Sequence, residues 1–282
     1  MKKKFRGHQA KTKDETPRRD FNDRRGENLK PDSRSSAVYG VLPVLELLRA
    51  NARRIDKIVI AEGVREHRLA EIVETAREKD IVVNLAPREN LNKIAGPGAN
   101  HQGVLAFAAA AEYAEPDEIL DSLDEKALLL ILDGVEDPHN LGALLRVADC
   151  TGVDGILIPE RRAVGLTETV AKSSAGAVEY VKVAKVANLN RLIEELKERN
   201  VWVVGTSVDA EMAYTEWDWT RPSALVLGGE GKGLHRLVAE NCDVLVKIPM
   251  YGKIDSLNVS VAAGVILFEA LRQRNQSSDS DV

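Results

Sequence analysis

The chain has 282 residues, of which 44% are hydrophobic and 29% are charged, and its formal net charge is -5. This length accommodates about two domains with sizeable cores, and the composition is that of a globular protein rather than a disordered chain. No apolar run approaches the roughly 18 residues that span a membrane, and no apolar stretch follows the basic start, as a secretory signal requires. We therefore expect a globular, cytoplasmic protein without a membrane partner.

Two cysteines, Cys150 and Cys242, are present. They are too few for a disulfide framework and lack the paired spacing of a zinc site. The sequence therefore predicts neither disulfide bonds nor a bound metal.

The charge is unevenly distributed along the chain. Residues 1–36 contain 12 lysines and arginines against 6 acidic residues, whereas residues 37–282 carry a net charge of -11. With so few large apolar side chains, the first 36 residues cannot bury enough surface to fold alone. We predict a disordered basic tail that either contacts nucleic acid or only increases solubility.

A small α/β domain is predicted at residues 37–108. The segment 56–61 reads as a buried strand, 66–80 as an amphipathic helix and 81–86 as another strand. A short helix that ends at Gly96 and a last strand within 101–110 complete the pattern. Residues 109–127 are acidic and weakly periodic, which indicates a linker with one short helix.

From residue 128 to 274, continuous apolar strands alternate with helices, and this alternation predicts a parallel sheet covered on both faces. Residues 275–282 read as a short polar tail. In such sheets ligands bind at the carboxyl ends of the strands. Three strands run into glycine-rich or polar loops at those ends, with the sequences "DGVEDPHN", "LGGEGKG" and "IPMYGKIDS".

The glycine-rich loop "LGGEGKGL" suggests the close approach of an anion, but it matches neither a P-loop nor a dinucleotide-binding fingerprint. Its acid, Glu230, either belongs to a functional site or complements the dipole of the following helix. No serine has the setting of a nucleophile elbow, which argues against a hydrolase.

Two further polar positions have alternative interpretations. Asn140 stands where a helix N-cap is expected, and Arg146 falls outside the apolar stripe of the same helix. Arg146 can reach an anion with its planar fork or form a surface ion pair. Near the last helix, Ser256 and Asn258 can act as a cap or as part of a site.

Three segments together resemble the three ordered motifs of the SpoU/TrmH family of RNA ribose 2'-O-methyltransferases. They are "LDGVEDPHNLGALLRVAD", "LVLGGEGKGL" and "IPMYGKIDSLNVSVAAGVILFEALRQR". The resemblance implies a SPOUT domain at 128–274, whose C-terminal segment forms a deep trefoil knot, a rarity among folds. Because "VYGVLPVLELLRAN" and "NHQGVLAFA" resemble the substrate-binding domain of the rRNA-modifying branch, it also implies a ribosomal L30e-like RNA-binding domain at 37–108.

The resemblance also implies a site. S-adenosylmethionine would be the methyl donor, without a metal, and would lie among three loops at Gly205, Thr206, Leu227, Gly228, Gly229, Ile248, Met250, Ser256 and Leu257. The implied catalytic set is Asn140, Arg146, Glu230, Ser256 and Asn258. Family proposals make Arg146 the proton acceptor. Its high pKa makes this demanding, and electrostatic activation of the 2'-hydroxyl is the alternative.

The implied function is 2'-O-methylation of a guanosine ribose in the peptidyl-transferase region of bacterial 23S rRNA. The resemblance also implies a homodimer, with the acceptor site where two C-terminal domains meet. Alternatives are methylation of the thiostrepton-site adenosine, methylation of a tRNA, and a non-catalytic role in RNA binding or ribosome assembly.

Overall fold

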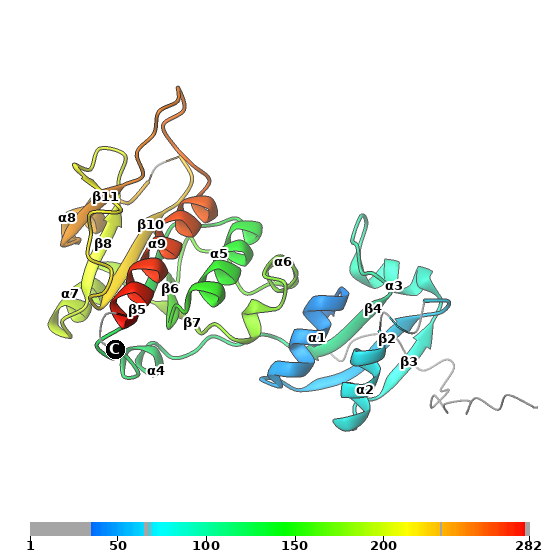
Figure 1. Cartoon of the computed structure of the whole chain (residues 1–282). Helices are drawn as coiled ribbons and strands as arrows, with labels where there is room; N and C mark the ends of the chain where they lie inside the picture. Colours follow the sequence, from blue (N-terminus) through cyan, green and yellow to red (C-terminus); the bar gives the residue numbers. More distant parts are fainter. Residues whose placement is uncertain (1–34, 65–66, 68, 232, 280–282) are drawn as a thin grey trace, which may run out of the picture.

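The structure is a computed structural model, and it describes residues 35–64, 67, 69–231 and 233–279. The predicted basic tail lies outside these residues, apart from its last two positions. The described chain forms two sheets with their helices, an N-terminal unit (residues 35–109) and a C-terminal unit (residues 128–279), which lie side by side (Figure 1).

The N-terminal unit is built on a four-stranded sheet of order β1-β4-β2-β3. Its elements are β1 (Ser35–Tyr39), α1 (Val41–Ala50), β2 (Ile55–Ala61), α2 (Ala70–Glu78), β3 (Val83–Ala86), α3 (Arg88–Ala95) and β4 (Val104–Ala109). Apolar side chains alternate along the strands, so that α1 and α2 pack on one face of the sheet and α3 on the other. The predicted α/β pattern is therefore confirmed, with β1 and α1 in front of it.

The C-terminal unit contains a seven-stranded sheet of order β7-β6-β5-β10-β8-β11-β9, in which all the paired strands are parallel. Its strands are β5 (Leu128–Asp133), β6 (Gly155–Pro159), β7 (Val183–Val186), β8 (Trp202–Thr206), β9 (Met212–Ala213), β10 (Ser223–Gly228) and β11 (Val244–Lys247). Its helices are α5 (Pro138–Thr151), α6 (Glu168–Ser173), the 3-10 helix η2 (Ala177–Glu179), α7 (Leu189–Glu198), α8 (Arg236–Asn241) and α9 (Val259–Asp279). The predicted parallel sheet is confirmed, whereas the trefoil knot stays a prediction.

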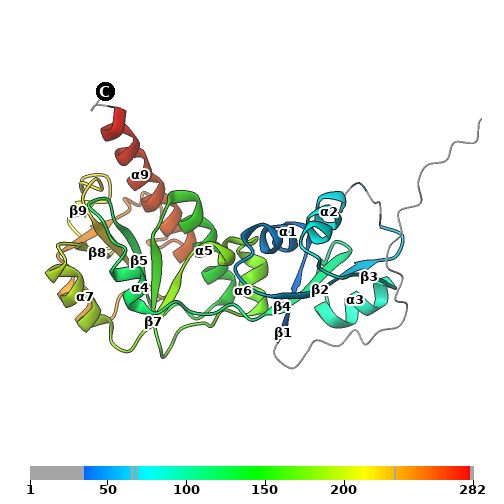
Figure 2. The same ribbon diagram turned by 90° about the horizontal axis from the view of Figure 1, so that it is seen from below.

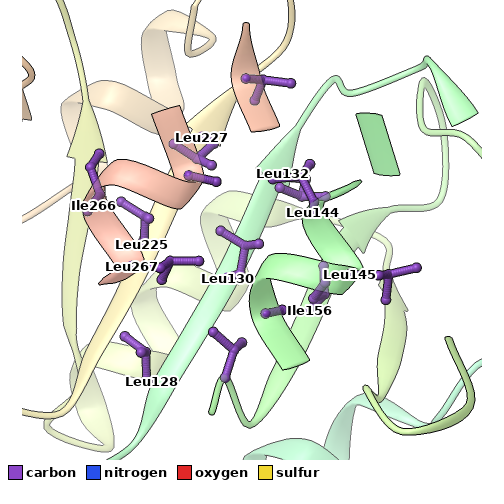
Figure 3. Packing of buried hydrophobic residues seen from close by; sticks show 14 of the residues in the cluster. Leu128, Leu130, Leu132, Leu144, Leu145, Ile156, Leu225, Leu227, Ile266 and Leu267 are labelled. Carbon is purple, nitrogen blue, oxygen red and sulfur yellow. The ribbon is translucent and has the colours of Figure 1, made fainter. Parts of the chain in front are cut away.

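Both faces of this sheet are buried, as the continuous apolar strands require. Leu128, Leu130 and Leu132 of β5 point to the layer formed by α5 and α9 (Figure 3). The alternate residues Leu129 and Ile131 pack in a second core with α7 and α8. The central strand β5 thus joins the two cores.

The connection between the units is ordered. Within it, α4 (Pro116–Leu120) is the single short helix expected there. Ala114 adds to the edge of the large sheet, because its amide donates to the carbonyl of Val183 at 2.9 Å. At the other end of the chain, α9 continues past Arg274 to Asp279, into the segment for which we predicted a polar tail.

The two units also contact each other directly. The amide of Ala37 in β1 donates to the carboxylate of Glu168 in α6 at 2.9 Å. Arg53 forms a two-pronged ion pair with Glu179, with N–O distances of 2.6 and 3.0 Å, and its side chain is only 9% exposed. Both views place α6 between α5 and the N-terminal unit (Figures 1 and 2).

Candidate active site

Four neighbouring strands of the large sheet, β5, β10, β8 and β11, end at the same edge because they are parallel. The loops that follow three of them are those that the sequence singled out. They lead to Asn140, Glu230 and Asn258, respectively. The candidate site is therefore at the carboxyl edge of the sheet, as predicted.

Asn140 lies in the first turn of α5 and not at its cap. Asp137 is the N-cap, because its carboxylate accepts a hydrogen bond from the amide of His139, and Pro138 occupies the first helical position. Proline is favoured there, since its missing N–H would have no helical partner. The cap prediction for Asn140 was wrong, and its amide side chain, which is 7% exposed, is free for another contact.

Asn258, not Ser256, caps the last helix. The Asn258 side-chain oxygen accepts from the amide of Ser260 at 3.0 Å and from its hydroxyl at 2.6 Å, and the Asn258 carbonyl accepts from the amide of Ala262. Ser256 is exposed two residues before the cap, in the segment that projects beyond β11 (Figure 1). The predicted cap role of Ser256 was therefore wrong.

The three side chains form one hydrogen-bonded group. The Nδ2 group of Asn140 donates to Oε1 of Glu230 at 2.5 Å. The Nδ2 group of Asn258 donates to Oδ1 of Asn140 at 2.9 Å and to the same Glu230 oxygen at 3.3 Å. Hydrogen bonds to a carboxylate are stronger than those between neutral groups, so this group ties together α5, the glycine-rich loop and the start of α9.

Two members of the predicted catalytic set lie outside this group. Arg146 is exposed on α5, and no hydrogen bond or ion pair of its side chain appears within the described part of the chain. Ser256 is likewise exposed. The structure therefore brings together Asn140, Glu230 and Asn258, and leaves Arg146 and Ser256 exposed to solvent.

The glycines of the predicted cofactor loops are required by contacts between chain segments. A Cβ atom on Gly228 would lie 2.0 Å from the carbonyl carbon of Gly233, and one on Gly229 would lie 2.2 Å from the carbonyl oxygen of Gly134. A Cβ atom on Gly205 would meet three side chains at 2.7 to 2.9 Å. These positions thus fix the loop conformation through close packing.

The remaining predicted cofactor residues line the same edge. Thr206 ends β8, and its hydroxyl donates to the carbonyl of Val226 at 3.2 Å. Leu227 is buried, Ile248 is half-buried, and Met250 and Leu257 are exposed although they are apolar. Exposed apolar side chains beside a polar group are typical of a ligand site, so the residues present fit the adenosine and the methionine chain that a sulfonium joins in S-adenosylmethionine.

The sequence patterns did not point to one pair of residues at this edge. Asp133, the last residue of β5, is buried and accepts from the amide of His235 at 2.7 Å and from its Nδ1 at 2.8 Å. The pair holds the end of the glycine-rich loop against β5. An acid directly before a glycine at a strand end was the only available signal.

Within the described residues, no group of three histidine, cysteine or acidic side chains is arranged to hold a metal ion. In the same part of the chain, every helix is too short or too polar to pass through a lipid bilayer.

Comparisons with known proteins identify the fold as that of an RNA methyltransferase. The profile of the SpoU rRNA Methylase family matches residues 127–268, and that of the RNA 2'-O ribose methyltransferase substrate-binding domain matches residues 37–114. The chain belongs to the SpoU methylase family.

Individual relatives resemble the chain over most of its length. YacO of Bacillus subtilis (strain 168), named for the TrmH family of tRNA/rRNA methyltransferases, is 47% identical over 241 residues, covering 84% of this chain and 96% of YacO. A crystal structure of an RNA 2'-O ribose methyltransferase superposes with a TM-score of 0.72 at 28% identity, covering 86% of this chain and 90% of that one. A rRNA methyltransferase from Sinorhizobium meliloti with bound AdoMet gives a TM-score of 0.70 at 26% identity, covering 85% and 87%.

Proposed function

We propose that this protein transfers a methyl group from S-adenosylmethionine to the ribose 2'-hydroxyl of a guanosine in bacterial large-subunit rRNA. The observation that carries the proposal is the group formed by Asn140, Glu230 and Asn258, which three loops bring together at one sheet edge. The family membership, the solved methyltransferase with bound AdoMet and the match to a substrate-binding domain support it.

The reaction depends on alignment. S-adenosylmethionine, when bound, supplies an electrophilic methyl group on a sulfonium centre. The protein has to hold the ribose hydroxyl in line with that group, and such positioning contributes roughly 7 to 11 kcal/mol. Glu230 is suited to this, because two amides fix one of its carboxylate oxygens while the other has no hydrogen-bond partner among the described residues. The free oxygen is available to a ribose hydroxyl.

Arg146 supplies a positive charge that acts on the ribose hydroxyl. It is exposed and free to bind the substrate phosphate and the 2'-oxygen, and its charge lowers the pKa of the hydroxyl. As the 2'-oxygen bonds to the methyl carbon and the carbon–sulfur bond breaks, the hydroxyl proton is released to water. Because an arginine stays protonated in proteins, we assign it this electrostatic role. General-base assistance of the usual kind contributes about 10² to 10⁴ in rate, so positioning is expected to contribute more than proton transfer.

The cofactor would be held by the loops after β8, β10 and β11, at the nine residues that the resemblance implies. Leu227, Met250 and Leu257 would cover its apolar parts, and Ser256 would orient the last loop. Residues 37–108 would form a separate RNA-binding domain joined by the linker 109–127 to the methyltransferase domain, and the protein would act in the cytoplasm.

We further propose a homodimer that pairs along α9. Val261 and Phe268 are seven residues apart on the same face of the helix, and each is 51% exposed. Val265, which lies between them on that face, is half-buried. Val147 of α5 continues this stripe beside Gly264. Apolar stripes of this kind are typical of protein interfaces. Phe268→Glu would then give a monomer in sedimentation analysis, whereas a monomeric wild-type protein would contradict the pairing.

The function can be tested with purified protein, labelled S-adenosylmethionine and separated bacterial rRNAs and tRNAs. The modified ribose is then mapped. Transfer to a guanosine of 23S rRNA is expected, transfer to another nucleotide or to tRNA would replace the substrate, and cofactor binding without transfer to any RNA would favour the non-catalytic alternative.

A further inference from the structure

A lysine of the methyltransferase unit lies on an aromatic ring of the N-terminal unit. Nζ of Lys172, in α6, is 4.3 Å from the centre of the Tyr39 ring, in β1. Both side chains are half-buried, and no ion pair of Lys172 with a carboxylate occurs among the described residues. One oxygen of the nearby acid Glu168 accepts a hydrogen bond from the amide of Ala37. The Tyr39 ring therefore holds the Lys172 ammonium group in place, and no carboxylate among the described residues forms an ion pair with it.

A second cation comes from the N-terminal unit. Arg88 is exposed in the first turn of α3, and its side chain also has no ion pair in the described part of the chain. Arg88 and Lys172 both act on the buried ring of His101: burial, and then the two positive charges, lower the pKa of His101. Arg88 is one turn from Asn92 on α3, and the Asn92 side chain contacts His101. Lys172 lies on Tyr39 of β1, which packs against α3. The two cations therefore come from neighbouring elements of the two units.

His101 itself adds no charge to this place. Its Nδ1 accepts a hydrogen bond from the amide of Gly103 at 3.0 Å, so the proton of the ring is on Nε2, which donates to Asn92 at 2.8 Å. Because the buried ring of His101 is neutral, it does not offset the positive charges of Lys172 and Arg88. Lys172 and Arg88 thus bring two positive charges to this surface against the one carboxylate of Glu168.

Helix α6, which carries Lys172, also contacts α5, the helix that carries Asn140. The hydroxyl of Ser173, the residue after Lys172, donates to the carbonyl of Pro138 at 3.2 Å. Pro138 begins α5, two residues before Asn140. A Cβ atom on Gly142 would lie 1.8 Å from the Ser173 hydroxyl, so the two helices are closely packed. The cationic surface and the hydrogen-bonded group are therefore held at a fixed separation by α6 and α5.

We propose that Lys172 and Arg88 form a binding site for backbone phosphates of the RNA substrate, at the seam between the two units, with Tyr39 positioning Lys172. This inference rests on the proposed function, since it concerns the same substrate. Phosphate contacts set the register of a bound nucleic acid without reading its sequence. The seam would thus hold the RNA segment next to the modified ribose on the surface that leads to Asn140.

The test is the salt dependence of RNA affinity, measured with the full chain and the RNA that the wild-type protein methylates. Each lost phosphate contact reduces the slope of log affinity against log salt by about 0.7 to 0.9. Lys172→Gln and Arg88→Gln should each weaken RNA binding several-fold and reduce the slope by this amount. S-adenosylmethionine affinity should stay unchanged.

Matched variants separate a phosphate contact from a general loss of charge or structure. Lys182→Gln and Arg77→Gln remove the same charges at exposed positions, immediately before β7 and on α2, and should retain the wild-type slope. Tyr39→Phe keeps the ring and should bind like wild type, whereas Tyr39→Leu should weaken binding. An unchanged slope in Lys172→Gln, with wild-type methylation intact, would overturn the seam site alone; absence of any methylation by the wild type would overturn the proposed function instead.

Discussion

The amide group of Asn258 donates a hydrogen bond to the side-chain oxygen of Asn140 at 2.9 Å, although 118 residues separate the two in the chain. Asn258 also caps α9 through its own oxygen. One side chain thus starts the last helix with its acceptor and joins the candidate active site with its donor. The two interpretations of this residue are therefore compatible: the cap is observed, and the catalytic role stays a prediction.

Asn258→Ser separates these two roles. Serine keeps an oxygen that can cap the helix, so the free energy of unfolding should stay within about 0.5 kcal/mol of wild type. It lacks the amide donor to Asn140 and Glu230, so methyl transfer should fall strongly. Urea unfolding and a methylation assay measure the two effects. Asn258→Ala should lose the cap as well, at about 1 kcal/mol.

Ser256→Ala is the matched control for that experiment. Because Ser256 is exposed and does not cap α9, its removal should leave the unfolding midpoint unchanged. Loss of stability in Ser256→Ala, with a stable Asn258→Ala, would restore Ser256 as the cap.

Arg146→Lys tests whether the planar fork is needed. Lysine keeps the charge but cannot form two parallel hydrogen bonds to phosphate. We expect turnover to fall at least tenfold, with S-adenosylmethionine binding and the thermal midpoint unchanged, because Arg146 is exposed. Normal turnover of Arg146→Lys, beside an inactive Arg146→Gln, would show that a positive charge alone suffices.

Much of this architecture could be predicted from the sequence. The apolar strands β5 and β10 are continuous and end in polar or glycine loops, and a parallel sheet brings such ends to one edge. The caps could not be predicted as reliably. Asp137 and Asn140 are both good capping residues, and only the fixed backbone of Pro138 between them favours the first.

The contacts inside the site depend on tertiary structure. The Asp133–His235 pair and the Asn140–Asn258 bond join segments more than 100 residues apart, and no local pattern encodes such distances. The resemblance supplied the residues of the catalytic set but not their arrangement, in which Arg146 stays outside the hydrogen-bonded group.

Gly229→Ala tests the loop packing. The added Cβ atom would meet the backbone oxygen of Gly134 at 2.2 Å, and a backbone atom cannot move aside cheaply. We expect lost S-adenosylmethionine binding in calorimetry and a lower thermal midpoint. Gly252→Ala, where the nearest atom would be 3.9 Å away, should behave like wild type. Equal binding by both variants would contradict the role given to Gly229.

The buried ion pair between Arg53 and Glu179 should hold the two units together. Removing one partner of a buried pair costs about 3–5 kcal/mol, so Arg53→Ala should lower the free energy of unfolding by that order. Arg54→Ala breaks an exposed pair with Asp56 and should cost about 0–1 kcal/mol. The double change Arg53→Met with Glu179→Leu should recover most of the loss. Similar costs for the Arg53 and Arg54 variants would show that the pair is not stabilising the seam.

His101 should make the protein less stable in mild acid. Its pKa is lowered in the folded protein by burial and by Arg88 and Lys172, so below its ordinary value of about 6.5 the unfolded chain binds a proton that the folded protein excludes. The stabilisation is therefore complete above that pH and is lost as the pH falls towards the lowered pKa. Urea unfolding between pH 7.5 and 5.5 should show a smaller decrease for His101→Gln than for wild type, while His139→Gln, at an exposed position, should follow the wild type. Parallel pH profiles for His101→Gln and wild type would mean that His101 titrates alike in the folded and unfolded chain.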